Sequence, residues 1–138
     1  MTMPDDMRAH NRNLIAQFRA DRGMSMGDRP LLLLTTIGRR TGEERTTPMM
    51  YVRDGDRLLV IASNNGAARD PLWYRNLVAN PDVTVELPGE TFPAKAQPLK
   101  GPAYDRDWTA VKERYPFFAD HEQRAAGRQI PVVELIRR

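Results

Sequence analysis

The stretch TTPMMYVRDGDRLLVIAS, residues 46–63, decides how this chain is expected to fold. Asp54-Gly55-Asp56 separates two runs rich in apolar residues, and Asp-Gly in such a setting is among the stronger hairpin signals. Pro48 lies inside the first run and has no N–H to donate to a neighbouring strand. That position is therefore expected at a sheet edge, at a bulge or facing a ligand. The stretch predicts an antiparallel hairpin with an irregular first strand.

Four more runs complete the expected set of strands. They are LLLLTTI at 31–37, VTVEL at 83–87, TFPAKAQPL at 91–99 and IPVVELI at 130–136. Because most connections are as short as hairpins, the pattern predicts a mainly β (α+β) fold, a split β-barrel of about six strands with peripheral helices. The alternative is a parallel crossover through a helix between the third and fourth strands.

Helical patterns lie between and around these strands. Asp70 is expected to cap a helix at 71–79 whose first residue is proline. Pro102 opens another helix, and residues 116–129 are helical or irregular.

The N-terminus is expected to form its own unit, residues 1–29, ahead of a barrel domain at 30–138. Residues 6–22 carry apolar side chains on one narrow face, which is typical of an amphipathic helix ending at Gly23. Arginines flank that face. The helix therefore either packs on the barrel or docks on a membrane surface.

Composition excludes several classes of protein. The chain has no cysteine and only two histidines, His10 and His121, without metal-ligand spacing, so neither disulfides nor a metal site is expected. Motifs for a Rossmann, P-loop or serine-hydrolase site are absent. No signal peptide is apparent, and the longest apolar run, Leu31–Leu34, is far shorter than the ~20 residues of a membrane span. A cytoplasmic location is the default, with membrane association through the N-terminal helix as the alternative.

The connection before residue 46 concentrates positive charge on a chain whose net charge is +3. Its guanidinium groups belong to Arg39, Arg40 and Arg45. Gly38 and Gly42 permit positive φ angles, so main-chain N–H groups there can converge on an anion, while each arginine can grip a phosphate bidentately. The alternative is a solvated turn whose arginines pair with Glu43 and Glu44.

Two further segments suit a bound aromatic ring. Pro48, Met49 and Met50 offer a polarizable surface with few donors, although methionine is more often core filler. Ala62-Ser63 ends a strand in small residues ahead of a helix N-terminus, a setting that lets a ligand approach closely.

In this order, the segments GRRTG, TTPMMY, DPLWYRNL and IPVVEL, within residues 31–135, resemble the deazaflavin-dependent nitroreductase family of actinobacteria, which includes quinone reductases. The resemblance implies a split-barrel oxidoreductase that uses coenzyme F-420, an 8-hydroxy-5-deazaflavin. It would transfer a hydride from the reduced cofactor to a small acceptor such as a quinone, an enone or a nitro compound.

The resemblance also implies roles for particular residues. Those expected to bind the cofactor are Arg39, Arg40, Thr41, Gly42, Arg45, Pro48, Met49, Met50, Ala62, Ser63, Asn64, Trp73 and Asn76. Asn64 stands where several relatives carry lysine. The acceptor pocket is expected at Tyr115, Phe118 and His121, where some relatives have tyrosines. From their expected positions around this pocket, we predict that Ser63 and Tyr115 orient the acceptor or protonate the product.

Two alternatives stay open. FMN could replace the deazaflavin, although its single phosphate needs fewer arginines. A non-enzymatic module could use the arginines for nucleic acid or another anion. Nucleic acid is disfavoured because aromatic residues make up only 7% of the chain and concentrate beyond residue 73. The sequence gives no indication of oligomeric state.

Overall fold

The computed structural model describes residues 3–24 and 30–138, with side chains described from residue 9 onward. Its elements in chain order are α1 (Met3–Ala20), β1 (Leu31–Ile37), β2 (Glu44–Asp54), β3 (Arg57–Ile61), the 3-10 helix η2 (Asn64–Gly66), α2 (Leu72–Ala79), β4 (Asp82–Leu87), β5 (Glu90–Pro98), α3 (Gly101–Arg114), α4 (Phe117–Arg124) and β6 (Val132–Arg137).

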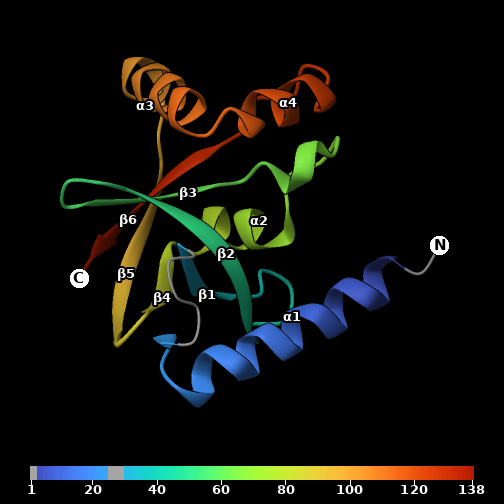
Figure 1. The fold of residues 1–138 in the computed structure, drawn as a ribbon, viewed down its shortest axis with the longest axis vertical. Coiled ribbons are helices and arrows are strands. Elements are labelled where there is room, and N and C mark those ends of the chain that lie inside the picture. The colour runs from blue at the N-terminus through green and yellow to red at the C-terminus, as the bar shows by residue number, and fades with distance from the viewer. Residues whose placement is uncertain (1–2, 25–29) are drawn as a thin grey trace.

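Six antiparallel strands close into a barrel in the order β1-β2-β3-β6-β5-β4. The split-barrel prediction is confirmed. The parallel crossover is wrong, because β4 pairs with β1 and β5 rather than with β3. Helices α3 and α4 lie together on one side of the barrel, and α1 lies on the opposite side (Figure 1).

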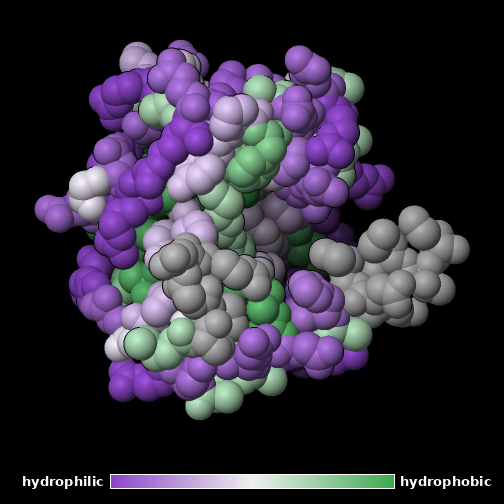
Figure 2. All heavy atoms as spheres, viewed as in Figure 1, coloured by the Kyte–Doolittle hydropathy of each residue, from purple (hydrophilic) through white to green (hydrophobic). Residues whose placement is uncertain are grey.

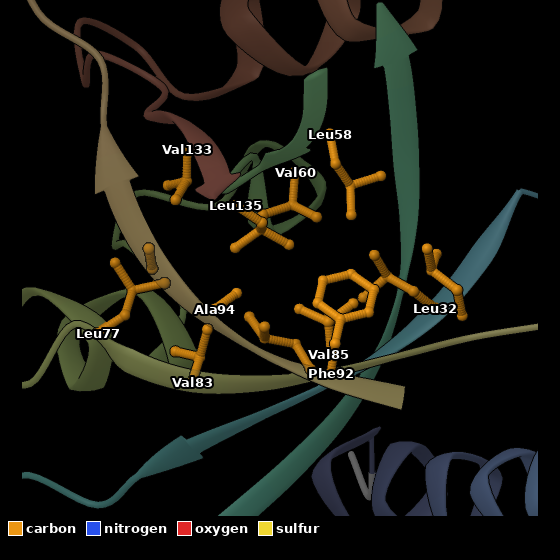
Figure 3. Packing of buried hydrophobic residues seen from close by; sticks show 13 residues of the cluster. Leu32, Leu58, Val60, Leu77, Val83, Val85, Phe92, Ala94, Val133 and Leu135 are labelled. Carbon is orange, nitrogen blue, oxygen red and sulfur yellow. The ribbon is translucent and has the colours of Figure 1, made fainter. Parts of the chain in front are cut away.

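Strand alternation divides the apolar residues between the barrel interior and its outer face. In β1, Leu32 and Leu34 join the interior cluster, whereas Leu31 and Leu33 belong to a separate cluster beneath α1. Leu77 of α2 also belongs to the interior cluster, among the barrel residues drawn in Figure 3. Helix α2 therefore packs against the barrel core.

Helix α1 packs its apolar face on the outside of the barrel. Leu14 and Phe18 are buried against β1, and Arg19 forms a bidentate ion pair with Glu86 of β4. The helix ends as expected near Gly23, whose N–H bonds the Phe18 carbonyl at 2.7 Å with φ at +83°. These contacts support the packed position over the membrane-docked one. In the described residues, no helix is long and apolar enough to cross a bilayer. The division at residue 29 stays a prediction.

Pro48 occupies the half of β2 that has only one neighbouring strand. It faces Leu33 of β1, while the β2–β3 ladder covers only Tyr51–Asp54. The Tyr51 N–H bonds the Pro30 carbonyl on the β1 side, so alternation turns the Pro48 nitrogen toward the unpaired side. The expected edge position is confirmed. In this half of β2, the strand therefore separates from the residues that follow β3.

The expected helix cap at Asp70 is wrong. Helix α2 begins at Leu72 after Pro71, with no side-chain cap. The Asp70 carboxylate instead accepts a 2.6 Å hydrogen bond from Arg128. Asp70 therefore forms a long-range ion pair with Arg128 in place of the expected local cap.

Candidate functional site

A groove of about 650 Å³ opens between α1, the turn joining β1 to β2, and the start of α2. Its walls are formed by Asn11, Arg12, Ile15, Gly38, Arg39, Arg40, Thr41, Glu44, Arg45, Thr46, Thr47, Leu72, Trp73, Arg75 and Asn76. Of the predicted cofactor residues, the structure thus brings Arg39, Arg40, Thr41, Arg45, Trp73 and Asn76 around one space. The face of the molecule drawn in Figure 2 is mainly hydrophilic, with apolar residues in smaller patches.

The charge of the groove is strongly unbalanced. Among its described walls, Glu44 is the one carboxylate, set against the guanidinium groups of Arg12, Arg39, Arg40, Arg45 and Arg75. Arg45 does pair with Glu43 at 3.4 Å, although both side chains are more than half exposed. Arg39 and Arg40 form no ion pair with any described residue. The solvated-turn interpretation therefore fits Arg45 alone.

Arg75 of α2 also lines the groove and has an unsatisfied donor. Its Nε atom is buried and has no hydrogen-bond partner among the described residues. An unpaired buried donor on a charged group costs free energy in the folded state. Sequence reasoning missed Arg12 and Arg75, because only the packing of α1 and α2 places them beside the arginine turn.

The turn is built by its own backbone rather than around a ligand. The Gly38 N–H bonds the Glu43 carbonyl at 2.7 Å, and the Gly42 N–H bonds the Gly38 carbonyl at 2.8 Å, with Gly42 at a φ of +74°. The Thr41 hydroxyl accepts from the Glu43 N–H at 3.2 Å. These amides are used internally, so the expected concavity of converging N–H groups is not formed by them. The turn presents arginine side chains instead.

Asn76 ties the turn to α2. Its buried side chain accepts from the Arg39 main-chain N–H and donates to the Thr36 hydroxyl, both at 3.2 Å. Trp73 lies one turn earlier on the same helix, packs partly against the barrel core and lines the groove. Asn76 thus fixes where the arginines stand relative to Trp73.

The predicted ring-binding residues lie just beyond the groove. Thr46 and Thr47 line it, and Pro48, Met49 and Met50 follow on β2, each half-buried. Met49 packs against the interior cluster and Met50 against the cluster beneath α3 and α4.

On the β3 side of the point where β2 and β3 stop pairing, Ala62 and Ser63 are buried directly after β3 ends. Arg128 holds this segment through hydrogen bonds to four acceptors: the Ala62, Ser63 and Ala67 carbonyls and the Asp70 carboxylate. Asn64 is exposed and donates to the Arg69 carbonyl at 3.0 Å. Sequence reasoning missed this role of Arg128, because nothing in its local pattern indicates it.

The three predicted acceptor-pocket residues differ in their surroundings. Tyr115 is half-buried and meets the Phe117 and Phe118 rings edge-on. Phe118 is only 5% exposed and packs on Trp108, so its side chain belongs to the core. His121 reaches Ser63, with 3.1 Å between its Nδ1 atom and the serine Oγ. Burial, reinforced by Arg124 and opposed by Asp120, lowers the pKa of His121.

Comparison with known proteins gives a family match and similar individual proteins. A family model described as F420H(2)-dependent quinone reductase matches residues 7–136. An F420H(2)-dependent quinone reductase of Mycobacterium tuberculosis is 43% identical over 114 residues, covering 81% of this chain and 76% of the relative.

Two solved structures are also similar. One, described as an F420-H2 dependent reductase (FDR-A), is 33% identical with a TM-score of 0.69, covering 78% of this chain and 94% of its own. Another, described as a domain-swapped dimer, is 31% identical with a TM-score of 0.72, covering 96% and 98%.

Proposed function

Since this chain belongs to the F420H(2)-dependent quinone reductase family and is thus an oxidoreductase that uses coenzyme F-420, we propose that it reduces a small quinone with the reduced cofactor. Enones and nitro compounds are the other acceptors to test. The similar protein from Mycobacterium tuberculosis is named a quinone reductase, which favours a quinone over the other two. These matches give the FMN alternative no support.

The observation that carries this proposal is the charge imbalance of the groove. The cofactor tail contains a phosphodiester and an oligoglutamate chain, so it needs several cations along one path. Five arginines facing one carboxylate supply them, and the unpaired Nε of Arg75 suits an anionic partner. We assign the tail to the predicted residues Arg39, Arg40, Thr41, Gly42 and Arg45, together with Arg12 and Arg75.

The deazaflavin ring would lie where β2 leaves β3. Thr47 and Trp73 line the groove, and the half-buried Pro48, Met49 and Met50 follow Thr47 along β2. Ala62, Ser63 and Asn64 follow β3 on the other side. Asn76 would act by holding the arginine turn, and Trp73 by bounding the ring.

When bound, the deazaflavin supplies the hydride, so the protein has to bind, orient and exclude water. Ser63 and Tyr115 are the polar groups that we assign to the acceptor. Phe118 would shape the pocket from beneath, as part of the core under Tyr115, and His121 would act through Ser63.

The test is a titration with oxidised coenzyme F-420 followed by acceptor screening with the reduced cofactor. We expect saturable binding by colourless protein and reoxidation of the reduced cofactor with a quinone. A purified protein that carries a yellow flavin chromophore and does not bind coenzyme F-420 would overturn the proposal. Turnover that Ser63→Ala and Tyr115→Phe both leave unchanged would overturn the two acceptor assignments alone.

A further inference from the structure

We propose that His121 is a positioning residue that directs the hydroxyl of Ser63 toward the acceptor and replaces the proton that Ser63 gives up. This inference rests on the proposed function, because it assigns a proton source to the same reduction. It does not require that His121 touch the acceptor.

Ser63 is held from two directions. Arg128 donates to its main-chain carbonyl at 2.6 Å, and His121 Nδ1 lies 3.1 Å from its hydroxyl. The contact is supported by close packing of η2 on α4. A Cβ atom added to Gly66 would lie 2.9 Å from the His121 carbonyl oxygen and 2.8 Å from Arg124 Cβ. The serine hydroxyl therefore has a fixed position and a fixed neighbour.

The direction of this hydrogen bond depends on the proton at Nδ1. If Nδ1 is unprotonated, it accepts a hydrogen bond from the Ser63 hydroxyl, and the serine oxygen can then only accept hydrogen bonds from other groups. If Nδ1 carries a proton, it donates to Ser63 Oγ, and the serine O–H is free to point at an acceptor oxygen. His121 thus decides whether Ser63 is a donor.

The proton balance of the reduction is complete with an imidazolium at His121. Hydride addition to a quinone leaves a negative charge on one of its oxygens. The Ser63 O–H bond breaks as its proton goes to that oxygen, and the Nδ1 proton passes to Ser63 Oγ. A neutral imidazole remains, which regains a proton from water because His121 is only partly buried. The acceptor gains one hydride and one proton.

The charges around His121 determine the sign of the pH dependence. Burial and Arg124 lower the pKa of His121 below its ordinary 6.5, while Asp120 opposes them. From the neighbouring segment, Arg128 faces Ser63 but has its own carboxylate partner in Asp70. Phe117 and Phe118 supply uncharged ring contacts at 5.6 Å between centroids. Turnover should therefore rise as the pH falls through a value below 6.5.

Four variants test the kinetic part, with His10→Asn as a matched control on an exposed histidine. His121→Phe keeps a ring but removes Nδ1, and we expect kcat to fall by roughly ten- to a hundredfold. Its cofactor Kd should stay unchanged. His121→Asn places a non-titrating amide near the Nδ1 position and should flatten the pH profile while restoring part of kcat. Ser63→Ala should be as slow as the Ser63→Ala/His121→Phe double variant, since both residues act on one proton.

An NMR titration of the two histidines tests the contact without any turnover. Ser63→Ala should change the Nδ1 shift and the pKa of His121 and leave His10 unaltered. Unchanged His121 signals, or a His121→Phe variant with wild-type kcat and pH profile, would overturn this inference. If the wild type reduces no acceptor, the proposed function and the relay both fail, and the NMR result then reports only whether the contact exists.

Discussion

The side-chain oxygen of Asn76 accepts a hydrogen bond from the main-chain N–H of Arg39 at 3.2 Å. This bond joins a helix that packs against the barrel core to a turn that carries the charge of the groove. The same side chain donates to the Thr36 hydroxyl, so Asn76 also fixes the end of β1. The position of the arginines therefore depends on a neutral, buried amide.

Asn76→Ala should weaken both the fold and cofactor binding. The free energy of unfolding should fall by about 1–3 kcal/mol, because buried groups lose their partners. The Kd for coenzyme F-420 should rise about tenfold as the turn loosens, equivalent to ~1.4 kcal/mol. Denaturant unfolding and a fluorescence titration would measure the two effects. Asn13→Ala, on an exposed part of α1, is the control and should change neither.

Arg39→Ala/Arg40→Ala should raise the cofactor Kd by roughly a hundredfold, since each charged hydrogen bond is worth about 1.5 kcal/mol. The dependence of Kd on salt should also become shallower, because fewer charges are left to screen. Arg53→Ala removes an exposed arginine from β2 outside the groove and should leave Kd unaltered. Equal losses in the double variant and the control would mean that charge acts without a defined site.

Arg12→Ala tests whether α1 is a wall of the site. Arg12 is exposed and lines the groove, so its removal should not change the unfolding midpoint. The Kd should rise by about three- to tenfold, in keeping with one partly solvated charge contact of roughly 1 kcal/mol. If Kd stays at the wild-type value, α1 supports the barrel without contacting the tail.

Asp107→Asn should lower stability without affecting the cofactor. Asp107 is buried on α3 and receives two hydrogen bonds from Arg57 of β3, at 2.6 and 3.1 Å. We expect a loss of about 1–3 kcal/mol in the free energy of unfolding, because the buried charged hydrogen bonds to Arg57 are weakened. The loss is limited because Glu134 and Asp54 still pair with Arg57. Unfolding curves at neutral pH would measure it.

The same ion pair predicts a pH dependence. Arg57 lowers the pKa of Asp107 below its ordinary 3.8. A depressed carboxyl pKa in the folded state stabilises the protein above the unfolded-state pKa and is lost as pH falls through the folded value. Wild type and Asp107→Asn should therefore differ most in stability near neutrality and converge below about pH 4. A constant difference down to pH 2 would contradict the assignment.

The fold was predictable because its signals are local. Asp54-Gly55 marks a hairpin, and the alternation in β4 and β5 marks half-buried strands, so the strands and hairpins required only short-range information. The pairs that close the barrel, β1 with β4 and β3 with β6, join segments far apart in the chain. The expected helix cap at Asp70 was wrong for a physical reason. Its carboxylate is taken by Arg128, 58 residues away, and no local capping rule detects such a competitor.

The candidate site was predictable in part, through ordered motifs rather than through local physics. Arg39, Arg40 and Arg45 are close in sequence, so their cluster was visible there. Arg12 and Arg75 join them only through the packing of helices on the barrel. The contact between His121 and Ser63 likewise spans 58 residues, and its partners were expected separately.

Binding of the anionic tail of coenzyme F-420 in the arginine groove can be tested directly. The most direct test compares the Kd of the oxidised cofactor with that of the same deazaflavin lacking its phosphodiester and glutamate tail. We predict at least tenfold tighter binding of the complete cofactor, roughly 1.4 kcal/mol, with the difference abolished in Arg39→Ala/Arg40→Ala. Equal affinity of wild-type protein for the two molecules would contradict the claim.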